Sequence, residues 1–272
     1  MKIAVLSDIH GNLEALKKCF EVIDNSNIKG VVFCGDYLSD IPQTKEVINY
    51  IKEKTLQYKT WIVRGNREDY IIDYHESDDK KWTLETNNAA VLVAHDSLNE
   101  EEHDYLKNLK KHEIINIPNT EKIYVTHKYR DIKYDENFEY KYVLFGHEHN
   151  QLYFSRKGIR FFNPGSVGIP ADGFIGTSML ILEYKDNAWQ PNFLQLKYDI
   201  TIPIEIIKNS NINHPNIKWG SAIIKTLETG FSYTAYYVSE VKKIAAKRGN
   251  STVLEEIPYD IWEAARKNIN ID

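Results

Sequence analysis

Five short motifs of metal-binding residues each follow a stretch typical of a buried β-strand, and this alternation constrains the fold more than any other feature of the chain. The motifs, in order, are Asp8-Ile9-His10, Gly35-Asp36, Gly65-Asn66, Thr126-His127 and Gly146-His147-Glu148-His149. The stretches before them, short, apolar and rich in β-branched or aromatic residues, are 2–6, 31–34, 61–63, 122–125 and 142–145. Runs of this kind are typical of strands covered on both faces. Side chains just beyond strand ends can converge at one edge of a sheet, so the sequence predicts a shared site.

The side chains in these motifs form a mixed set of nitrogen and oxygen donors. The set comprises two aspartates, one asparagine and four histidines: Asp8, Asp36, Asn66, His10, His127, His147 and His149. Such a set suits Mn, Fe, Zn, Co or Ni. Glycines lie beside several of these residues, and they permit sharp turns and a close approach of the backbone to a bound anion. The ordered motifs therefore predict a dinuclear metal site.

The five motifs together resemble the pattern of the calcineurin-like metallophosphoesterase superfamily. That pattern runs D-x-H, G-D, G-N-[HC]-[DE], a lone His and G-H-x-H. The small bacterial and archaeal phosphodiesterases are the most similar branch, because Asn163-Pro164-Gly165-Ser166-Val167-Gly168 follows the last motif as it does in those proteins. The resemblance covers roughly residues 1 to 200. It implies hydrolysis of a phosphate ester.

The resemblance also implies a role for each ligand. One metal is expected on Asp8, His10 and His149, the other on Asn66, His127 and His147, with Asp36 as the bridge. Two metals about 3.5–4 Å apart lower the pKa of a shared water and clamp the phosphoryl oxygens during in-line displacement. The expected cofactors are two divalent transition-metal ions (Mn, Fe, Zn, Ni or Co), with manganese favoured. The residues assigned to catalysis are Asp36, Asn66, Arg67 and His127.

Arg67 departs from the superfamily pattern, which places a histidine after the asparagine to protonate the leaving group. Arginine stays protonated and cannot serve as that acid, but its planar guanidinium can hold phosphate oxygens in a bidentate manner. General acid catalysis contributes roughly 10²–10⁴-fold, so good leaving groups should be favoured. Glu68 and Asp69 are alternative acids. Carboxylates at these positions are also typical of the first turn of a helix.

His95 competes with His127 for the position of the lone histidine, since it too follows an apolar run (91–94). We favour His127, because it follows a clear strand and one further strand separates it from the last motif. His95 is expected to be a structural or cleft-lining residue. The remaining histidines lack a ligand partner at a useful spacing and are expected at the solvated surface: His75, His103, His112 and His214.

Charge and composition restrict the substrate and the location. The net charge of −5 gives no global attraction to a long nucleic acid, because duplex-binding proteins usually carry a basic face. A small phosphorylated substrate is expected, bound by Asn12, Arg67 and Lys128, with Arg64 and Arg130 as further nearby cations. A strand that begins at residue 2 leaves no room for a signal peptide, and no apolar run is long enough for a membrane helix. We expect a cytoplasmic protein with no membrane partner.

The order of the elements predicts an α/β fold, a four-layer α/β/β/α sandwich with a C-terminal helical extension. Helical spacing at 12–23 and 44–54 alternates with the first strands, which indicates βαβ units. Four later strands without intervening helices, at 152–154, 160–162, 178–184 and 192–198, are expected to close a second sheet. The predicted domains are 1–199, with the metal site, and a helical extension at 200–272.

Helical periodicity in the extension is expected at 221–227, 232–247 and 259–267. Tyr233, Tyr236, Tyr237 and Val241 form an aromatic stripe within it, which either packs on the sandwich or serves as a lid or a homodimer face. Packing is the favoured interpretation.

The sequence thus predicts a metal-dependent phosphoesterase acting on phosphodiester or phosphoanhydride bonds of a small molecule. One alternative is a phosphomonoesterase or protein phosphatase. Another is a non-catalytic protein-binding scaffold, as in the retromer-subunit branch of the superfamily, where the metal site is degenerate. All seven ligand positions hold competent donors here, which favours the enzyme.

Overall fold

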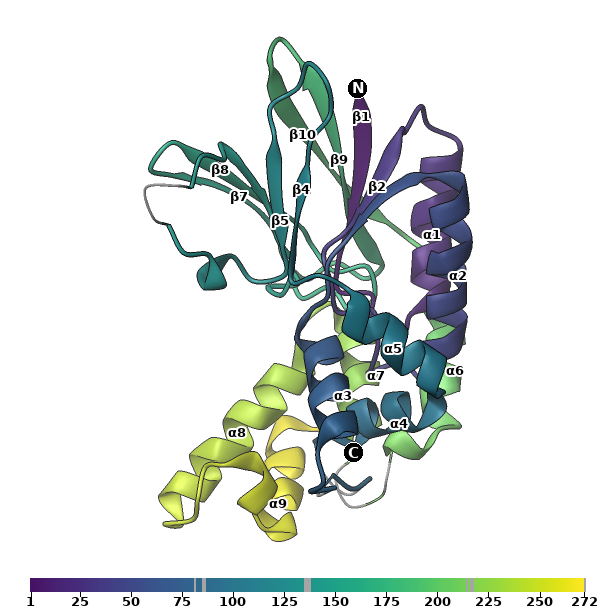
Figure 1. Ribbon diagram of the computed structural model, residues 1–272. Helices are drawn as coiled ribbons and strands as arrows, with labels where there is room; N and C mark the ends of the chain where they lie inside the picture. The colour runs from purple at the N-terminus through teal and green to yellow at the C-terminus, as the bar shows by residue number, and fades with distance from the viewer. Residues whose placement is uncertain (81, 85–86, 135–137, 214, 216–217, 272) are drawn as a thin grey trace.

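The structure is a computed structural model that describes residues 1–80, 82–84, 87–134, 138–213, 215 and 218–271. Its centre consists of two five-stranded sheets packed face to face (Figure 1). A cluster of buried apolar side chains fills the space between them, including Val5 and Val32 from one sheet and Val125 and Leu144 from the other. The mixed α/β architecture with two sheets flanked by helices confirms the predicted fold class.

The first sheet has the strand order β10-β9-β1-β2-β3. Strands β1 (Lys2–Leu6), β2 (Gly30–Phe33) and β3 (Lys59–Ile62) run parallel, with Val5 opposite Val32 and Val32 opposite Trp61. Helices α1 (Leu13–Asp24) and α2 (Thr44–Gln57) form the crossovers and cover the outer face of this sheet (Figure 1). The carboxyl ends of the three parallel strands therefore meet at one edge.

The second sheet has the strand order β4-β5-β6-β8-β7. Strands β5 (Ile123–Thr126), β6 (Tyr142–Leu144) and β8 (Ile159–Pro164) run parallel, and the antiparallel strands β4 (His112–Ile115) and β7 (Gln151–Arg156) form its edges. Its outer face packs against aromatic side chains of the segment around the short 3-10 helix η1 (Tyr129–Asp131). This covering layer is slight compared with the paired helices on the first sheet.

The last two predicted strands belong to the first sheet, which corrects their expected place in the second. Strand β9 (Thr177–Lys185) pairs antiparallel with β1, and β10 (Ala188–Leu196) pairs with β9 at the edge. The physical reason is burial on both faces of β9, since Met179 packs under the helices and Leu180 packs between the sheets. A strand that is apolar on both faces needs an interior position.

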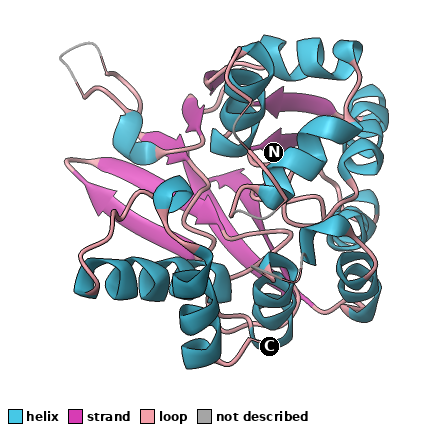
Figure 2. Ribbon diagram, turned by 90° about the horizontal axis from the view of Figure 1, so that it is seen from below, coloured by secondary structure: helices cyan, strands magenta, loops and turns pink. Residues whose placement is uncertain are grey.

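Three helices lie beneath the carboxyl edges of the sheets: α3 (Asn66–Glu76), α4 (Ala89–Ser97) and α5 (Glu100–Asn108) (Figure 1). The apolar run before His95, which could be read as a strand, forms α4. Figure 2, viewed from below, shows the helices distributed around the sheets at this end.

The segment after residue 196 is helical wherever it has regular structure among the described residues. Its helices are α6 (Thr201–Lys208), the 3-10 helix η2 (Asn211–Asn213), α7 (Trp219–Thr229), α8 (Tyr233–Lys247), the 3-10 helix η3 (Leu254–Glu256) and α9 (Tyr259–Ile269). Trp219, Tyr237 and Trp262 form their shared core, which also includes Ile41 and Ile169 from two loops at the carboxyl edges of the sheets. The helical segment therefore packs directly against these loops.

The aromatic stripe predicted on α8 is divided between core and surface. Tyr237 and Val241 are fully buried, whereas Tyr236 is exposed. Among the described residues, no α-helix has the length and apolar composition needed to cross a bilayer.

Candidate metal centre

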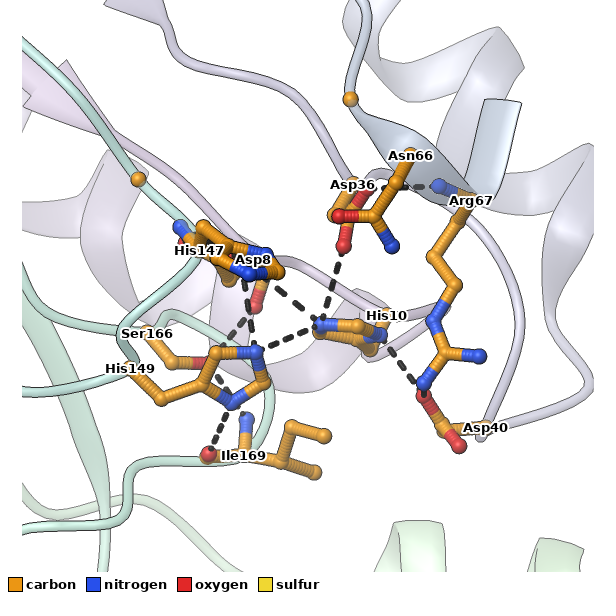
Figure 3. A network of polar contacts seen from close by, with 12 residues as sticks. Asp8, His10, Asp36, Asp40, Asn66, Arg67, His147, His149, Ser166 and Ile169 are labelled. Atoms are coloured by element: carbon orange, nitrogen blue, oxygen red, sulfur yellow. Dashed lines mark hydrogen bonds and ion pairs between the residues drawn. The ribbon is translucent and has the colours of Figure 1, made fainter. Parts of the chain in front are cut away.

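The seven predicted ligands lie together, at the seam where the carboxyl edges of the two sheets meet. Asp8 and His10 follow β1, Asp36 follows β2 and Asn66 begins α3 after β3, whereas His127 follows β5 and the last two histidines follow β6. Figure 3 shows the side chains of most of these residues turned toward one another from loops of different colours, and hence from distant parts of the chain. The first sheet thus supplies four donors and the second sheet three.

Five of these residues adopt the left-handed backbone conformation that side chains other than glycine rarely occupy. Their φ angles are 54° at Asp8, 50° at His10, 55° at Asp36, 73° at His147 and 57° at His149. Each such residue costs on the order of 1–3 kcal/mol and persists where the surroundings impose it. Among the described residues, thirteen residues other than glycine have a positive φ, and five of them are these predicted ligands. Such a concentration in turns that aim donor atoms inward is typical of a functional site.

Asp8, His10 and His149 form the first cluster. Nε2 of His10 lies 3.1 Å from Nε2 of His149, which in turn lies 3.4 Å from Oδ1 of Asp8 (Figure 3). Their candidate donor atoms all lie within 4.8 Å of one another. Two imidazole nitrogens this close, beside a buried carboxylate, form a donor set suited to a transition-metal ion.

Asp36, His127 and His147 form the second cluster, with the same limit of 4.8 Å between their donor atoms. Nε2 of His127 lies 3.4 Å from Oδ2 of Asp36 and 3.1 Å from Oδ1 of Asn66. The same Oδ2 of Asp36 lies 3.9 Å from Nε2 of His10 in the first cluster. Asp36 therefore lies between the two clusters, where a bridging carboxylate would have to be.

Hydrogen bonds to the outer ring nitrogens fix three of the imidazoles. Nδ1 of His127 donates to the carbonyl of Cys34 at 2.8 Å, and Nδ1 of His149 donates to the carbonyl of Ile169 at 3.0 Å. Nδ1 of His10 lies 2.7 Å from Oδ2 of Asp40. Each ring therefore presents Nε2 to the centre, in the arrangement typical of metal-binding histidines. The residues fit a pair of metal ions.

Electrostatic coupling between the two clusters is strong because the groups are buried. Burial opposes the ionisation of Asp36, but His127 and the neighbouring cations hold the pKa of its carboxyl well below the usual range. Burial also opposes protonation of His127, yet Asp36 raises its pKa to about 9. Burial and the neighbouring His127 lower the pKa of His147 to about 4. An anionic carboxylate is thus held at the centre.

Asp40 is a site residue that the motifs did not reveal. It is buried, adopts a left-handed φ of 40°, and contacts both His10 and the guanidinium of Arg67, whose Nη2 lies 3.5 Å away (Figure 3). It therefore orients a first-cluster imidazole and anchors the arginine at the same time. Its position four residues after Asp36 was the available signal, but no spacing rule distinguishes it from a surface aspartate.

Arg67 lies at the rim of the centre. Its backbone N–H donates to Oδ1 of Asp36 at 2.8 Å, and its side chain extends past Asn66 toward Asp40 (Figure 3). Among the described residues, its buried Nε has no hydrogen-bond partner. The guanidinium is therefore held by one carboxylate and retains donor capacity for an anion beside the centre.

Glu68 is a structural residue of the turn and not an alternative acid. It is fully buried, and its carboxylate accepts hydrogen bonds from the backbone N–H groups of Asp36, Tyr37 and Gly65 at 2.8–2.9 Å. Burial, with the nearby Asp36 carboxylate, raises the pKa of Glu68 to about 7. These bonds join the loops after β2 and β3. Asp69 forms ion pairs with Arg64 and Lys111, so the acidic start of α3 is accounted for by local contacts.

Residues Asn163 to Gly168, which begin at the end of strand β8 in the second sheet, hold the ligand loops after β1 and β6 in place. Oγ of Ser166 donates to the carbonyl of Asp8 at 2.7 Å, and Nδ2 of Asn163 donates to the carbonyl of Gly146 at 2.7 Å. A Cβ at Gly168 would lie 1.9 Å from the carbonyl oxygen of Ile9, so only glycine fits there. These residues explain how the loops after β1 and β6 are fastened together.

Asn12 does not face the centre, in contrast to its predicted role in substrate binding. It is fully buried, and its Oδ1 caps α1 by accepting from the N–H of Ala15 at 3.1 Å. Its Nδ2 donates to the carbonyl of Gly168 and to the hydroxyl of Tyr198. Both amide protons are thus used within the protein, and none is left for a substrate.

A cavity of about 250 Å³ opens beside the second cluster. Asn66, His127 and Lys128 line it, together with Arg64 and Lys111, whose charges are paired with that of Asp69 in the same wall. Tyr124 and His112 stack within it, with ring centroids 5.4 Å apart, so His112 lines this cavity. Arg130, another predicted cation of the site, is exposed and pairs with Glu148 at 3.3 Å.

His95 lies away from the centre, on α4, as expected from the preference for His127. The structure places His75 and His103 beside it, in contrast to their predicted places at the solvated surface. His103 is buried and His95 is half-buried. Sequence spacing concealed this cluster because its members come from three separate helices. His214 lies outside the described residues.

The chain is similar in sequence to several known proteins. A family model described as the calcineurin-like phosphoesterase superfamily domain matches residues 1–187. A protein named phosphodiesterase MJ0936 from Methanocaldococcus jannaschii is 24% identical over 186 residues, which is 65% of this chain and 93% of the relative. An uncharacterized protein from the same archaeon, MJ0912, is 28% identical over 236 residues, 76% of this chain and 92% of the relative.

A solved structure shares the fold over a longer stretch. The crystal structure of the hypothetical protein PH1004 from Pyrococcus horikoshii superposes with a TM-score of 0.68 at 21% identity, and the match covers 84% of this chain and 98% of that protein. This coverage exceeds the span of the family model. The structural similarity therefore includes part of the C-terminal helical segment.

Proposed function

The chain belongs to the calcineurin-like phosphoesterase superfamily, and on this premise we propose that it is a dinuclear metal-dependent hydrolase of phosphodiester or phosphoanhydride bonds in a small molecule. The observation that carries the proposal is the pair of three-residue clusters with Asp36 between them. The first ion would be held by Asp8, His10 and His149, the second by Asn66, His127 and His147, and both by Asp36. Manganese is the ion we favour, because the set mixes carboxylate and amide oxygens with imidazole nitrogens.

Two ions bound there would supply Lewis acidity and a hydroxide nucleophile at neutral pH. The protein's part is to hold the donors in a fixed arrangement and to keep Asp36 anionic. Hydrogen bonds from the outer ring nitrogens and the buried ion pairs around Asp36 achieve both. Because the donors come from strained turns, their arrangement is set before a substrate arrives.

Arg67 is assigned to the phosphate group. Its guanidinium is fixed by Asp40 at the rim of the centre, and it can donate two parallel hydrogen bonds to phosphoryl oxygens as negative charge develops on them. It cannot give a proton to a leaving group. Among the described residues, no histidine or free carboxylic acid replaces it there, since Glu68 is buried behind the loops. The enzyme should therefore favour substrates whose leaving group departs as a stable anion.

The cavity beside the second cluster is assigned to the rest of the substrate. Lys128 at its wall can pair with a second phosphate or with the free oxygen of a diester, and the Tyr124–His112 stack offers a flat ring surface. A volume of about 250 Å³ gives room for one small organic group beside the metals. This favours a small diester or anhydride over a protein or nucleic acid substrate.

Elemental analysis combined with two chromogenic substrates tests the proposal. Purified protein supplied with Mn²⁺, Ni²⁺, Zn²⁺ or Mg²⁺ should hydrolyse bis-p-nitrophenyl phosphate faster than p-nitrophenyl phosphate, and elemental analysis of the manganese-loaded protein should find two ions per chain. A preference for the monoester would support the phosphomonoesterase alternative. Folded protein without metal uptake or turnover under any of these conditions would instead indicate a scaffold.

A further inference from the structure

We propose that His75, His95 and His103 form a separate zinc-binding site on helices α3, α4 and α5. The three rings offer one nitrogen each within 4.8 Å of one another. Nδ1 of His75 lies 3.4 Å from Nε2 of His95, and the ring of His103 stacks on that of His75 with a centroid distance of 3.8 Å. Sites of this composition, three neutral imidazoles and an open fourth position, are typical of zinc.

The site is distinct from the strand-end centre. His75 follows Asn66 by nine residues on the same helix, and a rise of 1.5 Å per residue separates them by about 14 Å. An ion held by the helical histidines therefore shares no ligand with the catalytic pair. Its donors are also different, since this cluster offers nitrogen alone, which disfavours Mg²⁺, Ca²⁺ and Mn²⁺.

The distances within the cluster approach those of a bound ion. Zinc–nitrogen bonds of 2.0–2.1 Å in a tetrahedral arrangement place neighbouring donor nitrogens about 3.3 Å apart. The His75 and His95 nitrogens already meet this spacing at 3.4 Å. The candidate nitrogen of His103 lies within 4.8 Å of the other two, and its ring must leave the stacked position on His75 to reach this spacing. Among the described residues, its buried Nδ1 has no hydrogen-bond partner, as expected of a donor awaiting a ligand.

Carboxylates contact the outer nitrogens of two of the rings. Nδ1 of His95 lies 2.8 Å from Oδ1 of Asp96, which leaves Nε2 for the ion. Nε2 of His75 lies 3.4 Å from Oε2 of Glu100, which leaves Nδ1. Metal-bound histidines commonly donate their other N–H to a carboxylate, because this contact fixes the tautomer and makes the ligand more basic. Both exposed carboxylates would also offset the charge of the ion.

The surroundings hold the rings but leave a path for the ion. Tyr74 packs edge-on against His95 at 4.9 Å and stacks on Trp82 at 4.2 Å, so one side of the cluster is an aromatic wall. A cavity of about 320 Å³ opens along His75 and His103. The cation at its mouth, Lys107, is paired with Glu76. Burial and the neighbouring imidazoles lower the pKa of His103 to about 4, so this ring is neutral near pH 7.

Zinc counting on the full chain tests the site. Protein freed of metal by a chelator, given zinc and passed through a gel-filtration column should retain one more zinc ion per chain than His95→Gln or His75→Gln protein treated in the same way. His112→Gln is the matched control, because that histidine lies outside the cluster, and it should retain as much zinc as the wild type. Equal zinc content in the wild type and in both cluster variants would overturn the proposal.

A second measurement avoids any dependence on the folding of the variants. Crystals of the unaltered protein exposed to about 100 µM zinc should give an anomalous scattering peak between α3, α4 and α5, because this concentration nearly saturates any site with a dissociation constant below about 10 µM. No peak there, or a peak that needs millimolar zinc, would show that the rings stack without binding metal. Neither measurement uses hydrolysis, so the result is independent of the function proposed for the strand-end centre.

Discussion

The strand-end centre and the helical histidine cluster are two groups of metal-capable side chains built in opposite ways. The centre takes its donors from turns after strands, five of them with left-handed backbone angles, and surrounds them with buried carboxylates. The helical cluster takes its donors from regular helix faces, and its carboxylates are exposed. The fold bears the cost of backbone strain and of buried carboxylates at the first site, whereas the second site lies on helices and its carboxylates are exposed.

This difference indicates how strongly each group depends on metal. The centre gathers buried anionic carboxylates, which protonated imidazoles such as His127 balance in the absence of metal and which metal ions would balance when bound, so we expect the centre to hold metal tightly. Neutral imidazoles on helices can stack without an ion, so the helical cluster is expected to bind reversibly. Four changes test this contrast, in order of decreasing effect.

Asp36→Asn should produce the largest loss. The bridging carboxylate serves both clusters, so hydrolysis of bis-p-nitrophenyl phosphate should fall by roughly 10³-fold or more, while the fold, checked by circular dichroism, remains. His95→Gln, which alters the helical cluster, is the matched control and should keep near wild-type hydrolysis. An active Asp36→Asn enzyme would show that Asp36 does not bridge the two metal ions.

Arg67→His should reduce the preference of the enzyme for substrates with good leaving groups. A histidine can protonate the leaving group, so turnover of phenyl esters should rise by roughly 10²-fold relative to that of p-nitrophenyl esters, whose good leaving group needs little help. Arg67→Gln removes the charge without adding an acid and should slow both substrates. If Arg67→His changes both rates by the same factor, the absence of an acid does not explain the preference.

Asp40→Asn should weaken the first cluster without dismantling it. The buried carboxylate orients His10 and anchors Arg67, and loss of such an outer contact typically costs 10–100-fold in metal affinity or activity. Metal titration followed by activity would measure this. Asp96→Asn provides the comparison, since that carboxylate contacts His95 in the helical cluster. Equal loss of activity in the two variants would contradict the separation of the sites.

The smallest expected effect concerns the stability of metal-free protein in acid. The pKa of His103 is lowered to about 4 in the folded chain, chiefly by burial, against an ordinary value of 6.5. The unfolded chain then binds the proton first, so this residue decreases stability as pH falls from about 6.5 to 4. Replacement by Asn should make the thermal midpoint less sensitive to pH across that window. An unchanged pH dependence would show that His103 titrates normally.

The sequence predicts the strand-end donors well because each motif is local. Asp8 and His10, or His147 and His149, need only a strand before them and a turn beneath them, and both requirements are visible within ten residues. The same reasoning found α1, α2, α7, α8 and α9 through their apolar spacing, but it missed α6, where Pro203 indicated an irregular connection. Features whose signals lie within a short stretch of sequence were therefore predicted correctly.

The features that sequence reasoning missed depend on packing between distant segments. Asp40 acquires its role only when the loop after β2 folds over His10, and Glu68 only when three backbone amides from two loops turn toward it. Strand β9 joins the first sheet because both of its faces are buried there. The order of the strands along the chain does not reveal this. His75, His95 and His103 meet because three helices pack together, and their spacing in sequence reflects helix and loop lengths and not a ligand pattern.

The division of the ligands between the sheets has a consequence for the cohesion of the whole molecule. Each candidate ion would be held by side chains from both sheets, and the N–H of His147 on one sheet's loop already donates to both carboxylate oxygens of Asp8 on the other's. Metal occupancy and the docking of the sheets are then reciprocally linked: each ion favours the docked state by its binding free energy. By the same linkage, a substitution that destabilises the interface between the sheets must lower the affinity for the metal ions, even when it lies far from the site.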